Sequence, residues 1–329
     1  MTSYNRKPLD LSALKTVPIA GRGGKVRTAD FAAPYTPGSG VQGLMTALPK
    51  ILAGDMLRAA VDALAGARAA GKTVIWGLGG HVIKCGLAPV LADLMRRGYI
   101  GAFMMNGAAS IHDFEIAIAG CTSEDVEAVL PDGRFGSAEE TGREMNRAIV
   151  EGERDRIGMG EALGRHLDAI ATPEFAGYSL LLQAWRAKVP VTVHVAVGTD
   201  TPHAHPCVDA AAIGAATHRD FRLFCTLVTE LDGGGVYVNM GSAVVLPEVF
   251  LKALSAVRNL GHPVRGFTTV NLDFLQHYRP RVNVVERPHA GAGGRGISLT
   301  GHHEIMLPLI AAALIEKERA AAHDDGNER

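Results

Sequence analysis

The sequence predicts an α/β fold in which helices flank a mostly parallel sheet. Short apolar runs end in turns of small residues, and a helical pattern follows each turn. This order of strand, turn and helix occurs twice within residues 73–119. Such alternation is typical of parallel strands joined by crossover helices, so we expect most of the chain to form one sheet with helices on its faces.

The first predicted unit lies between residues 48 and 95. Apolar residues recur at helical spacing from Leu48 to Leu64, and Gly71 ends this helix. Residues 73–76 then read as a short buried strand. A glycine turn at 77–80 follows, and a helix runs from it through Met95.

The same unit repeats immediately, with a strand at 99–105, a turn at 106–109 and a helix to about Ala119. Further apolar runs and helical patterns follow. The remaining expected elements are helices at 175–188, 247–260 and 305–315, strands at 189–197, 236–240, 266–271 and 296–299, and a helix or strand at 221–229.

The chain is expected to contain one large domain. Residues 1–45 are rich in Pro, Gly and Thr and predict an extended N-terminal arm; residues 46–316 form the single α/β domain, and residues 317–329 form a charged C-terminal tail. The apolar segment 305–315 is shorter than the roughly 20 residues that cross a bilayer, and the N-terminus is too polar for a signal peptide.

Composition excludes several classes of partner. The chain has 33 basic and 34 acidic side chains, so it offers no charged field for nucleic acid or an anionic membrane, and we expect a small-molecule substrate. Its 4 cysteines are scattered without a Cys-x-x-Cys pair, which predicts free thiols in a reducing compartment, the cytoplasm.

Three turns are candidates for ligand contacts, at residues 77–80, 106–109 and 240–243. Ligands of open parallel sheets bind beyond the carboxyl ends of the strands, where helix N-termini favour phosphate. None of the turns is a complete dinucleotide fingerprint, because Val82 stands where the third glycine would be needed. Each turn, considered alone, is also typical of the tight turns found in any α/β protein.

Ionisable residues follow some of these turns. His112, Asp113 and Glu115 open one helix, where Asp113 could instead act as a cap. His302, His303 and Glu304 stand between a possible strand and an apolar helix. Ionisable groups at the boundary between sheet and helix indicate an enzyme.

A second group, Asp200, His203 and His205, follows the apolar strand at 189–197. An aspartate at a strand end beside two histidines suits acid/base chemistry or a metal ion. Histidines on a proline-rich loop are also often merely solvated.

The order of segments resembles deoxyhypusine synthase, an NAD-dependent family that transfers the aminobutyl group of spermidine to a protein lysine. The resemblance spans roughly residues 70–315. It rests on Gly79–Leu87, Asn106–Asp113, Leu130–Asn146, Pro173–Thr201, Val238–Val245, Phe267–Phe274 and Ile305–Ala313, which stand in serial order where that family has its motifs.

One departure from that family changes the expected chemistry. The family forms an imine on a lysine near its closing strand, but this chain has no lysine between Lys252 and Lys317. An imine needs an amine, and arginine cannot supply a nucleophilic one. We therefore expect a divergent member that is not a true deoxyhypusine synthase.

The resemblance implies a Rossmann-like, NAD-dependent transferase or oxidoreductase acting on a small polar, amine-bearing metabolite, assembled as a homotetramer. His112, His205 and Glu304 are the expected acid/base residues, with Asp113 orienting a histidine. By their matching positions, the expected cofactor-binding residues are Gly79, Gly80, His81, Asn106, Gly107, Asp200, Ser242 and Asn271.

Two alternatives remain at this stage. A metal-dependent hydrolase or lyase would use Asp200, His203 and His205, with His302 or His303 added, to hold zinc or a similar ion. A non-catalytic binding protein would retain the fold alone.

Overall fold

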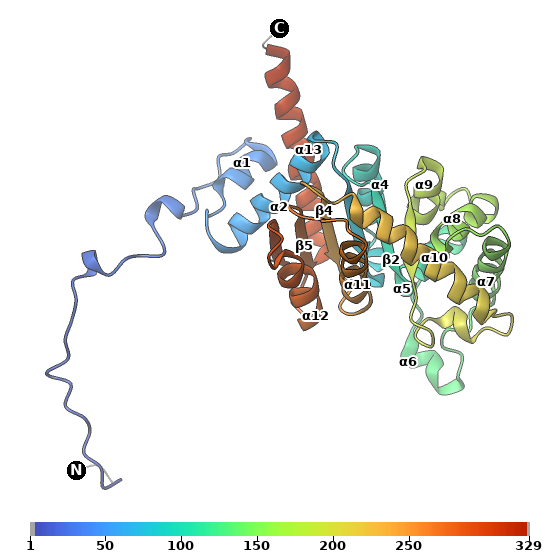
Figure 1. Ribbon diagram of the computed structural model, residues 1–329, viewed down its shortest axis with the longest axis horizontal. Coiled ribbons are helices and arrows are strands. Elements are labelled where there is room, and N and C mark those ends of the chain that lie inside the picture. The colour runs from blue at the N-terminus through green and yellow to red at the C-terminus, as the bar shows by residue number, and fades with distance from the viewer. Residues whose placement is uncertain (1–3, 328–329) are drawn as a thin grey trace.

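Six parallel strands form one sheet at the centre of the molecule (Figure 1). The computed structural model describes residues 4–327. Along the sheet the order is β3-β2-β1-β4-β5-β6. The strands are β1 (Val74–Leu78), β2 (Ala102–Asn106), β3 (Val191–His194), β4 (Val236–Met240), β5 (Thr268–Asp273) and β6 (Arg295–Thr300).

This order places a topological switch point between β1 and β4. The chain builds β2 and β3 on one side of β1 and then returns to add β4, β5 and β6 on the other side. Gly77 of β1 accordingly pairs with both Met104 of β2 and Asn239 of β4. The order is that of doubly wound dinucleotide-binding folds, whose ligands lie at the carboxyl edge of such a point. The predicted α/β class with a mostly parallel sheet is confirmed.

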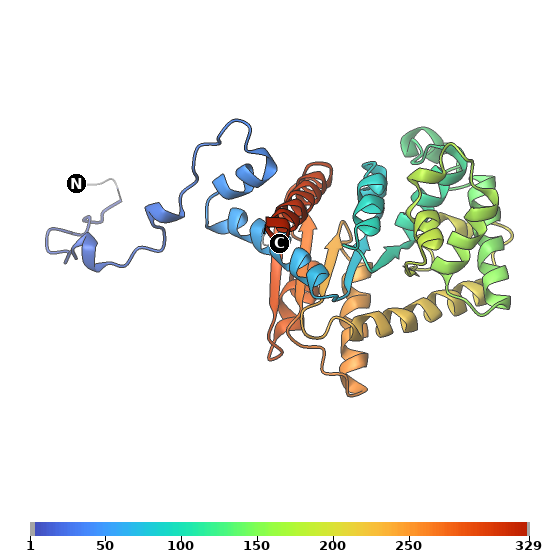
Figure 2. The ribbon, with the colours of Figure 1, turned by 90° about the horizontal axis from the view of Figure 1, so that it is seen from above.

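Helices cover both faces of the sheet (Figure 2). Trp76 and Phe103 pack into one core layer, whereas Ile75 and Met104, their neighbours along the same strands, pack into the other. This alternation is the period of two that strands impose on side chains. The first layer is covered by α2 (Leu52–Ala69), α4 (Ala88–Arg96), α5 (Gly107–Ala119) and α13 (His303–Asn327), and the second by α11 (Val245–Asn259) and the C-terminal half of α10 (Ala210–Thr229).

Shorter elements surround this framework. The other helices are α1 (Gly40–Ala47), α3 (Gly80–Lys84), α6 (Val126–Val129), α7 (Glu139–Arg154), α8 (Met159–Ile170), α9 (Leu180–Ala187) and α12 (Tyr278–Pro280). The 3-10 helices are η1 (Ile19–Gly21), η2 (Thr28–Asp30), η3 (Leu130–Asp132), η4 (Ala176–Tyr178), η5 (Thr201–Ala204) and η7 (Arg287–His289). The segment η6 (Arg281–Glu286) is a π-helix.

The structure divides or extends several predicted elements. The helix expected to run through Met95 is two helices, α3 and α4, because Gly86 between them has a φ of +73° that a helix cannot contain. Residues 221–229 are the end of the long helix α10. The strand expected at 189–197 is shorter, and a loop carries the chain from His194 to α10.

The two ends of the chain differ in how they meet the body. Residues 4–29 extend away from it and leave apolar side chains such as Leu9 and Ile19 exposed (Figure 1). Helix α13 continues without a break past residue 316, where Lys317 pairs with Asp62 at 2.5 Å. Within residues 4–327, no helix combines the length and the apolar character needed to span a membrane.

Candidate active site

The turns that follow β1 and β4 touch each other at the switch point. The Gly79 amide donates a hydrogen bond to the Met240 carbonyl at 2.9 Å. A Cβ on Gly79 would lie 2.0 Å from the carbonyl oxygen of Gly241. Glycine is therefore needed at position 79 for the two turns to approach, and its role is to pack the protein against itself.

Ser242 and Asn271 face into the protein. The Ser242 hydroxyl accepts a hydrogen bond from the Leu246 amide at 3.2 Å, near the start of α11. The Asn271 amide lies between Asn239, at 2.7 Å, and Gln276, at 2.8 Å. Both residues are almost fully buried and have partners inside the chain, so neither leaves a polar side-chain atom free for a cofactor in this structure.

The turn after β2 carries a different arrangement. Asn106 caps α5 by accepting a hydrogen bond from the Ala109 amide at 2.9 Å. The Asp200 carboxylate packs on Gly107, where a Cβ would lie 2.0 Å from Oδ2. That oxygen is buried and has no hydrogen-bond partner, and burial raises the pKa of Asp200. A buried carboxylate oxygen of Asp200 thus lies at the start of α5 without a hydrogen-bond donor.

His112 belongs to a relay of three side chains. Its Nδ1 lies 2.7 Å from the Thr122 hydroxyl, and that hydroxyl donates a short hydrogen bond to Glu115. Because the hydroxyl proton is directed to the carboxylate, Nδ1 must carry the imidazole proton and donate it. Glu115 also accepts a hydrogen bond from Thr141 at 3.1 Å, so both of its oxygens are held.

The other ring nitrogen of His112 is free. No described residue forms a hydrogen bond with Nε2, and the side chain is 19% exposed. The adjacent Cδ2 would lie 3.1 Å from a Cβ on Gly80, so this side of the ring faces the turn after β1. Burial, together with the charge of Lys84, lowers the pKa of His112 to about 4, so the ring is neutral at pH 7. Neutral imidazole with Nδ1 protonated leaves Nε2 as a lone-pair acceptor.

Asp113 does not orient a histidine, and that prediction is corrected. Its buried carboxylate accepts hydrogen bonds from the Ser179 hydroxyl at 2.5 Å and from the amides of Leu180 and Leu181 at 2.7 and 3.0 Å. These donors form the N-terminus of α9, so Asp113 caps a helix distant in sequence. Burial outweighs these bonds and raises its pKa to about 6.

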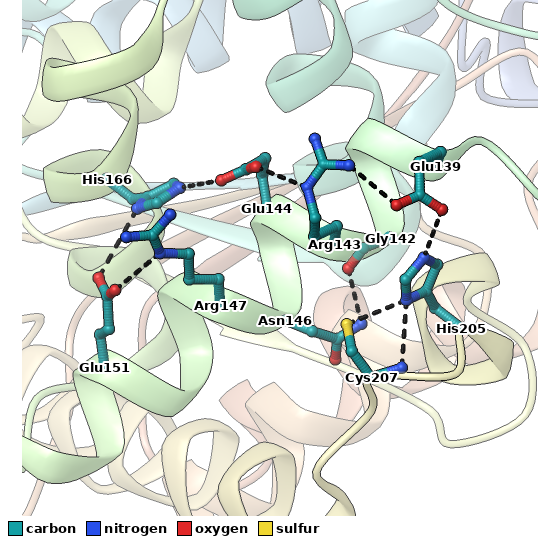
Figure 3. A network of polar contacts seen from close by, with 10 residues as sticks. All are labelled: Glu139, Gly142, Arg143, Glu144, Asn146, Arg147, Glu151, His166, His205 and Cys207. Carbon is teal, nitrogen blue, oxygen red and sulfur yellow. Dashed lines mark hydrogen bonds and ion pairs between the residues drawn. The ribbon is translucent and has the colours of Figure 1, made fainter.

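His205 lies in a network of polar side chains along α7 (Figure 3). The Cys207 amide donates to its Nδ1 at 3.3 Å, and its Nε2 lies 3.3 Å from Glu139. Arg143 links Glu139 to Glu144, which extends the network along the helix. Both ring nitrogens of His205 therefore have partners, unlike those of His112.

The alternative metal site at 200–205 is not assembled. Asp200 packs on Gly107, whereas His205 faces Glu139 and Cys207. Among the side chains of residues 4–320, the histidine, cysteine and carboxylate ligand atoms that converge within 4.8 Å belong to His81, Cys85 and Glu304. Glu304, an expected acid/base residue, thus lies beside a thiol and not beside His112.

Two cavities border these groups. One of about 520 Å³ is lined by Asp200, His205 and Glu139. A second, of about 530 Å³, adjoins the His112 relay, and its lining includes Glu115, Thr122 and Thr141 together with the acidic residues Glu124 and Glu140. His112, Glu115 and Thr122 are close in sequence. The sequence does not show, however, that the Thr122 side chain points back toward the helix that carries the other two.

Comparison with known proteins supports the resemblance seen in the sequence. No family model matches. The chain is 24% identical over 277 residues to a probable deoxyhypusine synthase of Methanosarcina thermophila, covering 74% of this chain and 80% of that protein. It is also 24% identical over 293 residues to probable deoxyhypusine synthase 1 of Methanosarcina mazei, covering 78% and 85%.

Solved structures share the fold. A LOR/SDH protein from Methanococcus maripaludis S2 superposes with a TM-score of 0.51 at 16% identity, over 82% of this chain and 71% of that one. AgrE, solved in a ternary complex with ornithine and NAD+, superposes with a TM-score of 0.50 at 15% identity, over 81% of this chain and 34% of that one. The chain is thus similar in sequence to deoxyhypusine synthases, and its parallel sheet is the fold that it shares with the solved structures.

Proposed function

We propose that this chain is an NAD-binding enzyme of the transferase or oxidoreductase type that acts on a small amine-bearing metabolite with His112 as its acid/base group. The observation that carries the proposal is the free Nε2 of His112, held by the Glu115–Thr122 relay beside Gly80. A structural histidine normally satisfies both ring nitrogens or leaves them to solvent. Here one nitrogen is anchored and the other faces the edge where ligands of this fold bind.

The relay accounts for how His112 would move a proton. Nε2 accepts a proton from the substrate while Nδ1 stays bonded to Thr122. The imidazolium charge that develops is then stabilised through the Thr122 hydroxyl by the Glu115 carboxylate, a role like that of the carboxylate in a catalytic triad. In the next step the same nitrogen returns the proton, so the group ends each cycle neutral.

Acidic side chains favour a cationic substrate. The cavity beside Glu115 and Thr122 is also lined by Glu124 and Glu140 and by no Lys or Arg, although His112 itself is not among its lining residues. An ammonium group would be attracted there by charge and would find carboxylate acceptors. AgrE, which shares the fold, was solved with ornithine, a diamine amino acid, and NAD+.

The fit of a dinucleotide is supported at one side of the switch point. Asp200 offers a buried acceptor without a donor, which suits a ribose hydroxyl. Asp200, with Gly80 and Gly107, would hold the cofactor, whereas Gly79 and the side chains of Asn106, Ser242 and Asn271 pack or bond within the protein. When bound, a nicotinamide cofactor would supply hydride transfer.

Tryptophan fluorescence tests cofactor binding directly. Trp76 is buried in β1, two residues before the turn, and Trp185→Phe isolates its signal. We expect saturable quenching by NAD, and Asp200→Asn to weaken binding about tenfold or more, because a charged hydrogen bond is worth roughly 1.5–3 kcal/mol. The exposed Asp132→Asn is the matched control. The absence of a saturable response, with no cofactor co-purifying, would remove NAD from the proposal.

We also propose a homo-oligomer, a tetramer as the resemblance implies, in the cytoplasm. The exposed apolar side chains of the arm, including Leu9, Leu11, Ile19 and Phe31, support self-association because a single copy leaves them uncovered. Light scattering during gel filtration gives the mass of the assembly, and a monomer at micromolar concentration would contradict this part.

A further inference from the structure

A compact group of three potential ligands lies at the carboxyl edge of the sheet, outside the His112 relay. His81 and Cys85 are four residues apart on α3 and its C-terminal cap, so they share one side of that turn. Glu304 reaches them from the first turn of α13, more than 200 residues later in the chain. The sheet brings them together because α3 and α13 both begin at its carboxyl edge.

The spacing of these atoms matches a metal coordination shell. His81 Nε2 lies 3.3 Å from Cys85 Sγ, and Cys85 Sγ lies 3.6 Å from Glu304 Oε2, with all three ligand atoms within 4.8 Å of one another. Tetrahedral zinc with bonds of about 2.0–2.3 Å separates neighbouring nitrogen, sulfur and oxygen ligands by roughly 3.5 Å. The side chains need little movement to surround an ion.

We propose that His81, Cys85 and Glu304 bind a divalent metal ion of the zinc type. The nitrogen, sulfur and carboxylate ligands are those that zinc prefers over magnesium or calcium. A thiolate and a carboxylate together neutralise the two positive charges, so the loaded site carries no net charge. Three protein ligands leave the fourth position open to water, the arrangement of catalytic zinc sites.

Metal binding requires the thiol to lose its proton. In the metal-free chain the Cys85 thiol donates to Glu304. When the ion binds, sulfur and carboxylate oxygen both turn their electron pairs to the metal, and the thiol proton leaves to solvent. No electron is transferred, and no other reactant is needed.

Neighbouring aromatic rings support the ligands. His302 Nδ1 lies 3.7 Å from Glu304 Oε1, the carboxylate oxygen that does not face Cys85, and its ring stacks on Phe274 at 5.8 Å with an interplanar angle of 4°. The buried His303 ring lies 5.6 Å from His81. Both separations are longer than a hydrogen bond, so these rings border the ligands by packing alone.

The test uses the full-length chain after removal of bound metals, titrated with Zn²⁺ or Co²⁺ alone. We expect one equivalent per chain by mass spectrometry, and with Co²⁺ a near-ultraviolet thiolate-to-metal charge-transfer band. Cys85→Ser should abolish that band and weaken binding more than tenfold. Cys225→Ser, which removes a similarly half-buried thiol with no converging ligands, should retain both.

Two further measurements distinguish a loss of metal binding from a loss of folding in the variants. Zn²⁺ should raise the melting temperature of the parent and of Cys225→Ser, but not that of Glu304→Gln, whose circular dichroism should match the parent. Binding below one equivalent, or a cobalt spectrum unchanged by Cys85→Ser, would overturn the assignment. Neither outcome bears on NAD binding, which the fluorescence titration reports separately.

Discussion

Two regions of the sheet edge hold a histidine close to a glutamate, yet they differ in what remains available for chemistry. In the α5 region, Thr122 holds one nitrogen of His112 and leaves the other free. In the region around η5, Cys207 and Glu139 occupy both nitrogens of His205. The same residue type at the same edge thus has one ring nitrogen without a hydrogen-bond partner in the first region and partners for both ring nitrogens in the second. The candidate site is distinguished by a polar atom without a hydrogen-bond partner, more than by the type of residue.

The largest expected effect is the loss of His112. Replacing it with asparagine should lower kcat/KM by about 10²–10⁴-fold, the usual contribution of a general acid/base group. The exposed His218→Asn is the matched control and should keep the parent rate. If His112→Asn and His218→Asn turn over the identified substrate equally fast, the two regions do not differ as we infer.

The pH dependence of kcat/KM tests whether the His112 ring is neutral at physiological pH. Because burial lowers the pKa of His112 to about 4, its neutral form dominates from pH 5 upward, and kcat/KM should show no histidine-like fall between pH 8 and 5. A free histidine would lose activity below its ordinary pKa of 6.5. A rate profile with an inflection near 6.5 that disappears in His112→Asn would show that the ring is not desolvated.

The relay itself gives the next effect. Glu115→Gln removes the charge that stabilises imidazolium while keeping the size of the side chain, and should lower kcat about 10–100-fold with little change in KM, since a charged hydrogen bond is worth roughly 1.5–3 kcal/mol. The exposed Glu127→Gln, outside both the relay and this cavity, is the control. A change confined to KM would instead assign Glu115 to substrate binding.

Asp113 is expected to affect stability more than chemistry. Asp113→Asn weakens the cap of α9 and should cost about 2–3 kcal/mol of unfolding free energy, measured by denaturant titration. The folded pKa of about 6 lies above the ordinary 3.8, so the native state retains this proton between those values. The unfolding free energy should therefore fall as pH rises through that window, and the variant should lack this contribution. A variant as stable as the parent would contradict the capping role.

The smallest effect is expected at His205. His205→Ala breaks contacts with Cys207 and with the exposed Glu139, so activity should stay within about twofold of the parent. A loss comparable to that of His112→Asn would reverse the ranking of the two regions and place catalysis beside the Asp200 cavity.

Much of the framework could be predicted because it depends on local pattern. The strands β1, β2, β4, β5 and β6 lie within a few residues of the expected apolar runs, each followed by its turn. The helices α7 and α8 were not expected, although α7 contains the network of Figure 3. Charged residues dominate the sequence of α7, whereas α8 is mixed, and both helices carry an apolar face that packs on α5 and α10.

The candidate site was predicted in part. His112 was identified from its place after a turn, but nothing in the sequence connected it to Thr122, and Asp113 was assigned to a histidine. Asp113 caps α9, whose first residues lie 67 positions away. Backbone donors at a helix N-terminus have no sequence signature of their own, so their partner cannot be identified before the helices are packed.

The amino-acid sequence by itself determined the α/β class, the succession of strands and turns, and the absence of a lysine between Lys252 and Lys317, because these follow from side-chain chemistry and short-range spacing. Tertiary structure decided which polar side chains have an atom without a hydrogen-bond partner. His112 and Asp200 retain one, whereas Ser242 and Asn271 do not. The physical reason is that hydrogen bonds are satisfied by whichever groups the packed chain brings within about 3 Å, and most of those are distant in sequence.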